Sequence, residues 1–344
     1  MHAYISAIEY DLPEGLLTNE MLGVEFPEWS VEKIEEKIGI GIRRIAAKDE
    51  CASDIGVRAA EKLFANGVCS REDIDYLLFC TQSPDYFLPT TACIMQDRLG
   101  LPKSCGALDF NLGCSGYIYG LGLAKGLIET GQASNVLLIT AETYSKHIHP
   151  GDKSVRTLFG DAAAATLIQS LGEAETKIGP FVYGTDGCGG KNLIVPTGGF
   201  RSPRTVESAQ VEEDDQGNLR SQDNLFMNGS EIFTFTLRTI PKSVKELLSL
   251  SGKLLDDIDL FVFHQANKFM LEHLRKKLNV PEDKFYMSFK NYGNTVSSTI
   301  PIALKDAQSE GKLKSGDLVM LVGFGVGYSW GATLLHWYTP LSII

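Results

Sequence analysis

Short apolar runs that alternate with amphipathic stretches are the feature that most limits how this chain can fold. The runs are rich in Val, Leu, Ile and Phe, which is typical of strands buried on both faces. They are residues 76–82, 135–140, 162–169, 260–265 and 318–325. The stretches between them carry apolar residues at helical spacing and cover residues 53–67, 116–131, 230–252 and 267–278. Strands that alternate with helices predict an α/β fold.

The chain also reads as two similar halves. In each half a strand leads to a reactive side chain at a turn and then to a helix, in residues 110–121 and again in residues 261–274. We place the halves at residues 1–172 and 173–344. Residues 198–225 of the second half are polar and acidic, which predicts a surface excursion. A lid or a partner-binding segment is the alternative interpretation of this insertion.

Composition excludes several classes of protein. The chain has 32 basic and 43 acidic side chains and a net charge of −11, which disfavours binding to nucleic acid or to an anionic membrane. No apolar run approaches the roughly 18 residues of a membrane helix, and no signal peptide is recognisable at the start. Seven scattered cysteines without a CxxC pair favour reduced thiols over disulfides or zinc ligands. We therefore expect a cytoplasmic protein without a metal site.

Cys114 is the candidate nucleophile. It follows apolar sequence, precedes a predicted helix and is flanked by Gly113 and Gly116, which permit a tight turn and the close approach of a substrate. At a helix N-terminus the thiolate is favoured, which predicts a lowered pKa. A buried small residue in a packed turn is the alternative. Cys188 is the only rival among the other cysteines, and no helix is predicted after it.

A histidine, an asparagine and a glycine-rich segment accompany this cysteine. His264 ends an apolar strand, where it can point into a cleft and act as a hydrogen-bond donor or a base. Asn294 lies in a turn and can donate to an oxygen that becomes negative. The alternative interpretations are a buried core histidine for His264 and an ordinary turn residue for Asn294. Residues 323–327 lack the spacing of a dinucleotide fingerprint, so we expect their backbone N–H groups to face a site. Together these groups favour acyl transfer through a thioester, without a cofactor.

The sequence resembles the β-ketoacyl-[acyl-carrier-protein] synthase III family, within the thiolase-like condensing enzymes. The motifs that carry the resemblance follow the family's order over nearly the whole chain. They are GIGIRRIAAKDECASDIGVRAAEKL, TACIMQDRLGL, DFNLGCSGYIYGL, LFGDAAAATLI, MNGSEIFTFTLRTIPKSV, HQANKFMLEHL, NYGNTVSSTIPIAL and LVGFGVGYSWG. Several long motifs in a fixed order are far more specific than any one of them.

The resemblance implies a five-layered αβαβα fold of two pseudo-symmetric halves and a homodimer. It implies that Cys114 takes an acyl group from acyl-CoA and passes it to malonyl-acyl-carrier protein in a decarboxylative Claisen condensation. His264 and Asn294 would stabilise the enolate formed by loss of CO₂. The backbone N–H groups of Cys114 and Val326 would hold the oxyanion at the acyl-cysteine, and CoA would enter only as part of the substrate.

Some positions depart from the family's usual pattern. Val326 stands where a glycine is usual, and its β-branched side chain should narrow the site. Lys153 stands where an arginine is common and could still meet a CoA phosphate as a point charge. Trp29 lies upstream of the position where the family usually has a tryptophan. Phe269 stands where the family has a basic residue, and Lys268 is its neighbour. Trp29 and Lys268 are candidates for contacts to CoA.

Two further candidates concern the acyl group. Phe324, in the glycine-rich segment, is expected to contact the substrate. Leu88 stands where the family commonly has an aromatic gate that the partner subunit contributes to the acyl pocket. A softer gate should admit other acyl chains.

The sequence also discriminates against other functions within and outside this fold. A thiolase needs a second catalytic cysteine near the C-terminus, and none follows Cys188; a hydroxymethylglutaryl-CoA synthase needs a glutamate where the chain offers Asp85. An enzyme that moves an unusual acyl group to a hydroxyl or amine is the main alternative. A non-catalytic acyl-carrier-binding subunit would not need Cys114, His264 and Asn294.

Overall fold

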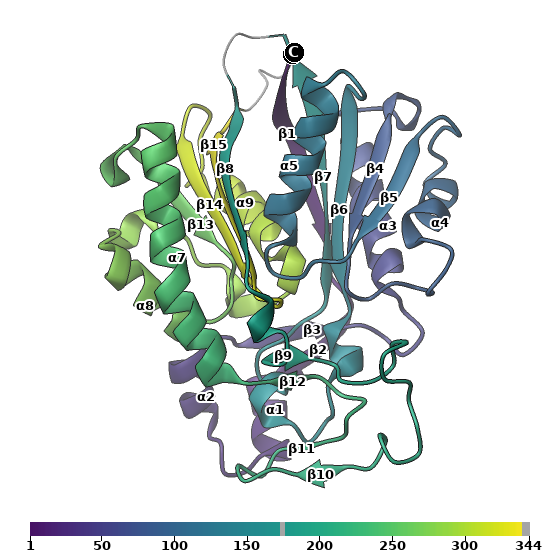
Figure 1. The fold of residues 1–344 in the computed structure, drawn as a ribbon, viewed down its shortest axis with the longest axis vertical. Helices are drawn as coiled ribbons and strands as arrows, with labels where there is room; N and C mark the ends of the chain where they lie inside the picture. Colours follow the sequence, from purple (N-terminus) through teal and green to yellow (C-terminus); the bar gives the residue numbers. More distant parts are fainter. Residues whose placement is uncertain (173–175, 339–344) are drawn as a thin grey trace.

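Two β-sheets face each other across a central layer of helices, and further helices cover their outer faces (Figure 1). The computed structural model describes residues 1–172 and 176–338. The first sheet has the order β1 (His2–Asp11), β7 (Ala162–Leu171), β6 (Asn135–Glu142), β4 (Tyr76–Cys80) and β5 (Gly106–Phe110). The second has the order β8 (Ile178–Thr185), β15 (Ser329–His336), β14 (Leu318–Gly325) and β13 (Leu260–Phe263). These layers give the five-layered α/β fold that the resemblance implies.

The two sheets repeat one pattern of strand directions. In the first sheet β4 runs parallel to β6, β6 antiparallel to β7, and β7 antiparallel to β1. In the second, β13 runs parallel to β14, β14 antiparallel to β15, and β15 antiparallel to β8. The first sheet lies within residues 1–172, and the second lies after residue 175; residues 173–175, at the predicted boundary, are outside the described part of the chain.

This repeat corrects one detail of the sequence analysis. The counterpart of β13, which precedes His264, is β4, whereas Cys114 follows β5. The two reactive turns that the pattern equated are therefore not equivalent in space. The turn that carries Asn294 is the closer counterpart of the Cys114 turn, because each leads into a helix of the central layer.

The central layer consists of α5 (Gly116–Glu129) and α9 (Thr299–Ser309), and both helices contact strands of both sheets (Figure 1). Such a position requires a helix that is apolar around much of its circumference, as α5 is. The outer face of the first sheet is covered by α3 (Ala52–Ala65) and α4 (Thr91–Arg98). The outer side of the second holds α7 (Gly229–Ser251), with α8 (Lys268–Leu278) packed against it.

The apolar runs and amphipathic stretches of the sequence become the strands and helices that were predicted. All residues of β13 and β14 are buried, as expected of strands covered on both faces. The helix predicted at 230–252 begins at Asn228, whose side chain accepts from the N–H of Glu231, and ends at Gly252 with a φ of 65°. Among the described residues, no helix is long and apolar enough to cross a membrane.

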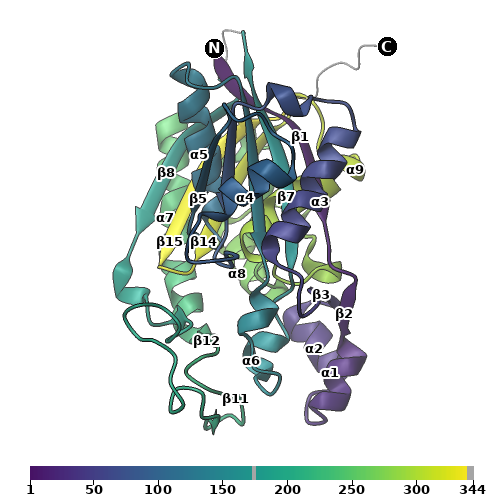
Figure 2. The same cartoon turned by 90° about the vertical axis from the view of Figure 1, so that its right-hand side faces the viewer.

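Smaller elements gather at one end of the sheets (Figures 1 and 2). They are β2 (Gly15–Thr18), α1 (Asn19–Glu25), α2 (Val31–Ile38), β3 (Ile42–Ile45), α6 (Lys153–Arg156), β9 (Leu193–Ile194), β10 (Glu212–Glu213), β11 (Leu219–Arg220) and β12 (Phe226–Met227). The strands β10 and β11 form a hairpin inside the predicted excursion at 198–225. Arg220 fixes this hairpin through ion pairs with Asp152 at 3.0 Å and Asp214 at 2.7 Å. The excursion lies on the surface, as predicted, and is anchored beside α6.

Helix α5 offers a test of the central layer, because Leu121 is fully buried in it and Leu123 is 43% exposed. Leu121→Ala should lower the free energy of unfolding by about 2–5 kcal/mol, since the cavity cannot close between two sheets. Leu123→Ala is the matched control and should cost about 1 kcal/mol or less. Denaturant unfolding measures both, and equal losses would contradict a central position for this helix.

Candidate active site

Cys114 lies in the turn between β5 and α5 and is 5% exposed. Two glycines make room for close packing around it. A Cβ atom added to Gly325, the last residue of β14, would lie 2.7 Å from the Cys114 sulfur, and one added to Gly116 would collide with the sulfur of Cys80. These glycines therefore let the end of the second sheet meet the start of α5 at the sulfur.

The sulfur lies among apolar groups and two backbone donors. Burial raises the pKa of Cys114 to about 12, although the backbone N–H groups of Val326 and of Cys114 itself interact with the sulfur and lower it. The lowered pKa predicted from the helix N-terminus is therefore wrong, because loss of water disfavours the thiolate more than the donors favour it. The structure does bring together, at this sulfur, the two N–H groups that the resemblance assigned to an oxyanion hole.

His264 follows β13 directly and is 2% exposed. Its backbone N–H donates to the carbonyl of Val322 over 2.8 Å, which extends the pairing of β13 with β14 by one residue. Its ring Nδ1 lies 2.8 Å from the hydroxyl oxygen of Thr299 at the start of α9. Burial lowers the pKa of His264 to about 3, so the ring is neutral at pH 7.

Asn294 is held by its own backbone in the turn before α9. Its N–H donates to the carbonyl of Leu158 over 2.8 Å, and its carbonyl accepts from Gly160 at 3.1 Å. Its side-chain oxygen accepts the N–H of Val296 at 2.9 Å. The amide nitrogen is thereby left as the end of this side chain that can donate to a ligand.

Cys114, His264 and Asn294 line one cavity of about 90 Å³ together with Phe324 and Gly325. The rings of His264 and Phe324 are nearly perpendicular, with ring centres 5.6 Å apart. The remaining lining residues come from the smaller elements at the end of the sheets, from α7, and from α8 and the turn before it: Leu158, Phe159, Leu193, Met227, Gly229, Ile232, Ala266, Asn267 and Met270. The site is thus a small, largely apolar chamber on which Cys114, His264 and Asn294 converge.

A second cavity of about 1030 Å³ begins beside the first, and Leu193 lines both. Val326 lines the second cavity, with its backbone N–H at the Cys114 sulfur. The other lining residues are Gln82, Phe87, Asn111, Tyr144, His147, Gly190, Ile194, Val195, Thr197, Gly198, Gly199, Phe200, Pro203, Arg204, Leu225 and Gly327. The geometry places this larger space next to the candidate nucleophile.

The remaining predicted contacts lie farther from the sulfur. Lys153 pairs with Glu28 at 2.8 Å, and Glu28 precedes Trp29, so these two candidates for CoA binding are close together. Lys268 is exposed at the first turn of α8. Leu88 is 81% exposed and lines neither cavity.

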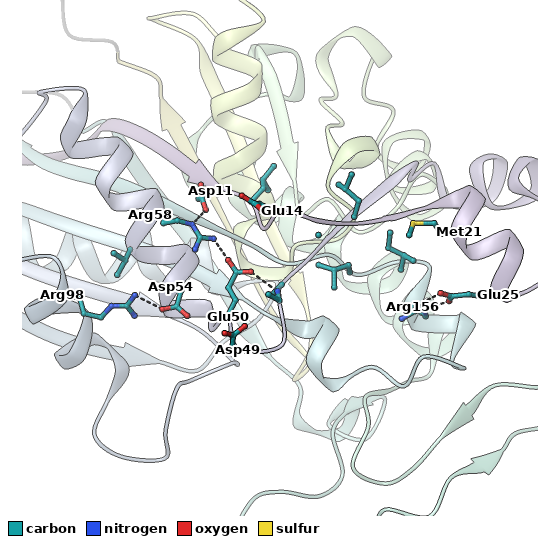
Figure 3. A pocket seen from close by; sticks show the side chains of 18 residues that line it. Asp11, Glu14, Met21, Glu25, Asp49, Glu50, Asp54, Arg58, Arg98 and Arg156 are labelled. Carbon is teal, nitrogen blue, oxygen red and sulfur yellow. Dashed lines mark hydrogen bonds and ion pairs between the residues drawn. The ribbon is translucent and has the colours of Figure 1, made fainter.

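A further hollow lies away from Cys114, between β2, β3, α1 and α3 (Figure 3). Its charged side chains pair with each other: Arg58 with Asp11 and Glu50, Arg98 with Asp54, and Arg156 with Glu25. None of the predicted site residues lines it. Its ion pairs join α3 to β1 and to α4, and α6 to α1, and we assign the hollow no part in the chemistry.

Several residues around the two cavities were not predicted. Thr299 belongs to a helix that the sequence analysis missed, and Gln82 ends a predicted strand without any sign of a function. Buried Glu142 accepts the N–H of Gln82 at 3.0 Å and the hydroxyl of Ser297 at 2.9 Å. Position at a strand end was the only available signal for Gln82, and it does not separate a functional residue from a structural one.

Comparison with known proteins identifies the family. Residues 108–187 match the model of 3-oxoacyl-[acyl-carrier-protein] synthase III, and residues 248–337 match that of its C-terminal part. A β-ketoacyl-[acyl-carrier-protein] synthase III of Clostridium perfringens is 40% identical over 323 residues, covering 94% of this chain and 95% of that one. The enzyme of the same name from Caldanaerobacter subterraneus is 37% identical over 326 residues, covering 95% of both chains.

Solved structures agree with the sequence comparison. A crystal structure of a 3-oxoacyl-(acyl-carrier-protein) synthase III has a TM-score of 0.97 and 52% identity, covering 98% of this chain and all of the other. A 3-oxoacyl-(acyl-carrier protein) synthase from Burkholderia xenovorans has a TM-score of 0.90 and 39% identity, covering 100% of this chain and 96% of the other. The chain belongs to the β-ketoacyl-[acyl-carrier-protein] synthase III family.

Proposed function

We propose that this protein condenses an acyl-CoA starter with malonyl-acyl-carrier protein, releasing CO₂ and a β-ketoacyl thioester. The observation that carries the proposal is the convergence of Cys114, a neutral His264 and Asn294 on one small chamber. A nucleophile beside two neutral donors suits covalent acyl transfer followed by stabilisation of an enolate. The names of the relatives support the same reaction.

In the first half-reaction the sulfur of Cys114 attacks the carbonyl carbon of acyl-CoA. The oxyanion of the tetrahedral intermediate accepts from the N–H groups of Cys114 and Val326, the two donors at the sulfur. The carbon–sulfur bond to CoA then breaks, the acyl group stays on Cys114, and the thiol proton leaves with CoA. The apolar chamber excludes water that would hydrolyse the acyl-cysteine.

In the second half-reaction malonyl-acyl-carrier protein enters the chamber. Loss of CO₂ leaves an enolate, whose oxygen accepts hydrogen bonds from the ring of His264 and the amide of Asn294. The enolate carbon attacks the acyl-cysteine, the carbon–sulfur bond breaks, and the Cys114 thiolate regains a proton. Because His264 is neutral, it stabilises the enolate as a hydrogen-bond donor and does not quench it with an acidic proton.

The hydroxyl of Thr299 bears on which ring nitrogen of His264 carries the proton. It lies 2.8 Å from Nδ1 of His264 and 3.0 Å from the carbonyl of Val296, to which it can also donate, and the His264 ring interacts with the same carbonyl. When the hydroxyl donates to Nδ1, the ring proton is on Nε2, which can then donate to the enolate. We assign Thr299 this positioning role.

The partners follow from the same proposal. Acyl-CoA and the malonyl-carrier thioester are substrates, CoA leaves as a product, and Lys153 and Trp29 lie together as candidates for holding CoA. We also propose a homodimer, because β5 pairs only with β4 among the described strands and leaves Leu108 41% exposed at a sheet edge. Leu88 is 81% exposed, so its side chain can contact a partner subunit.

Removing each donor should separate the half-reactions. His264→Ala and Asn294→Ala should keep acylation by acyl-CoA but slow decarboxylation and condensation by about 10²–10³-fold each, the usual cost of losing one oxyanion donor. Cys114→Ala should lose condensation entirely. Mass spectrometry of the acyl-enzyme and assay of the β-keto product measure the two steps. Wild-type enzyme that acylates but passes its acyl group to a hydroxyl or amine, with no β-keto product, would contradict the condensation.

The Thr299 hydroxyl should affect only the second half-reaction. Thr299→Val keeps the shape but leaves Nδ1 to donate to the carbonyl of Val296, so decarboxylation should slow about tenfold, by the loss of roughly one hydrogen bond. Thr299→Ser should restore it, and neither variant should change the acylation rate. A loss of acylation as large as the loss of decarboxylation would show that Thr299 supports packing only.

A further inference from the structure

The cavity beside Cys114 has a polar wall at its inner end. Gln82, Asn111 and Tyr144 line it there, and His147 lies next to Tyr144, with ring centres 6.3 Å apart. A Cβ atom added to Gly113 would lie 2.6 Å from the side-chain oxygen of Gln82. Gly113 precedes Cys114, so this amide is close to the first atoms of an acyl chain on the sulfur.

Gln82 is held in place at both ends. Its backbone N–H donates to Glu142 over 3.0 Å, and its side-chain nitrogen donates to the oxygen of Asn111 over 3.0 Å. Its side-chain oxygen accepts from the hydroxyl of Tyr144. The second N–H of its amide has no hydrogen-bond partner within the described residues, and nor does Nδ1 of His147. A fixed amide with a spare donor is preorganised for a ligand.

The space for the chain at this end is narrow. The side chain of Val326, like the oxygen of Gln82, would lie 2.6 Å from a Cβ atom added to Gly113. An acyl group on Cys114 therefore meets the amide of Gln82 and the methyl groups of Val326 together. Apolar side chains such as Phe87, Phe200 and Leu225 line other parts of the cavity.

On the basis of the proposed function, we infer that the acyl group carried by Cys114 bears a hydroxyl group within its first four carbons. Gln82 and Asn111 offer N–H donors to that hydroxyl, and the Tyr144 oxygen offers an acceptor. An unsubstituted alkyl chain would exclude water from the free amide N–H of Gln82 without offering it another acceptor. The lost hydrogen bond would weaken binding of that chain. The only charged residue that lines the cavity within the described chain is Arg204, which is exposed; burial, together with the positive charge of Arg204, lowers the pKa of His147.

Competition between two acyl donors of equal length tests this inference. Wild-type enzyme is mixed with equal amounts of 3-hydroxybutyryl-CoA and butyryl-CoA, each hydroxyl enantiomer separately, and the acyl-enzymes are counted by mass. One enantiomer should load roughly tenfold faster than butyryl, the effect of about one hydrogen bond. Gln82→Met should abolish the preference while butyryl still loads, and Tyr144→Phe should reduce it.

The chain provides a matched control. Gln169 in β7 has the same kinds of partner, donating to Asn135 over 2.8 Å and accepting from Tyr4 at 3.3 Å, but it lines neither cavity. Gln169→Met should leave the ratio unchanged. Preferential loading of butyryl-CoA, or of succinyl-CoA in a parallel mixture, would overturn this inference but leave the proposed function intact. No loading from any donor would instead contradict the proposed function.

Discussion

The contact between Gly325 and the sulfur of Cys114 is the constraint on which the site depends. Gly325 and Cys114 belong to different halves of the fold. A side chain at residue 325 would collide with the Cys114 sulfur and push the two backbones apart. Because the gap is open, β14 ends against the start of α5 and delivers the N–H of Val326 to the sulfur. The same strand fixes the backbone of His264 through Val322. One close approach thus positions the nucleophile, an oxyanion donor and the enolate donor.

Burial gives these groups their protonation states. The chamber is small and mostly apolar, so water solvates neither the sulfur nor the imidazole, and both are neutral at rest. A neutral imidazole is the form required beside an enolate, since an imidazolium would hand over its proton. A neutral thiol is less reactive, and the two N–H donors must offset this in the transition state, where negative charge develops within their reach. The chemistry therefore depends on donors placed in advance rather than on a resting thiolate.

The fold could be predicted from the sequence where burial is continuous. The run at 318–325 became β14 because all its residues are buried, and the periodic stretch at 230–252 became α7. A strand was expected before Cys114, but the residues of β5 were not among the apolar runs, because β5 is a half-exposed edge with no clear alternation. The helix α9 was missed because Pro301 interrupts the helical pattern. The duplication was predicted, but the Cys114 turn was matched to the wrong turn of the second half. The order and direction of the strands, which show the correct match, cannot be read from the sequence.

The site was predictable in part for a similar reason. Cys114, His264 and Asn294 each follow a local signal, and the structure places them together. The pKa of Cys114 was predicted in the wrong direction, because burial is a property of the whole fold and not of the turn. The polar wall of Gln82, Tyr144 and Asn111 could not be predicted, since its residues come from three separate segments.

The covalent acyl-cysteine is the central claim, and intact-protein mass after brief mixing with acyl-CoA tests it most directly. Wild-type enzyme should gain the mass of one acyl group, and Cys114→Ala should gain none. Cys188→Ala, which removes an exposed thiol outside the site, should behave as the wild type. Acylation that persists in Cys114→Ala, or no acylation of the wild type by any acyl-CoA, would contradict the mechanism.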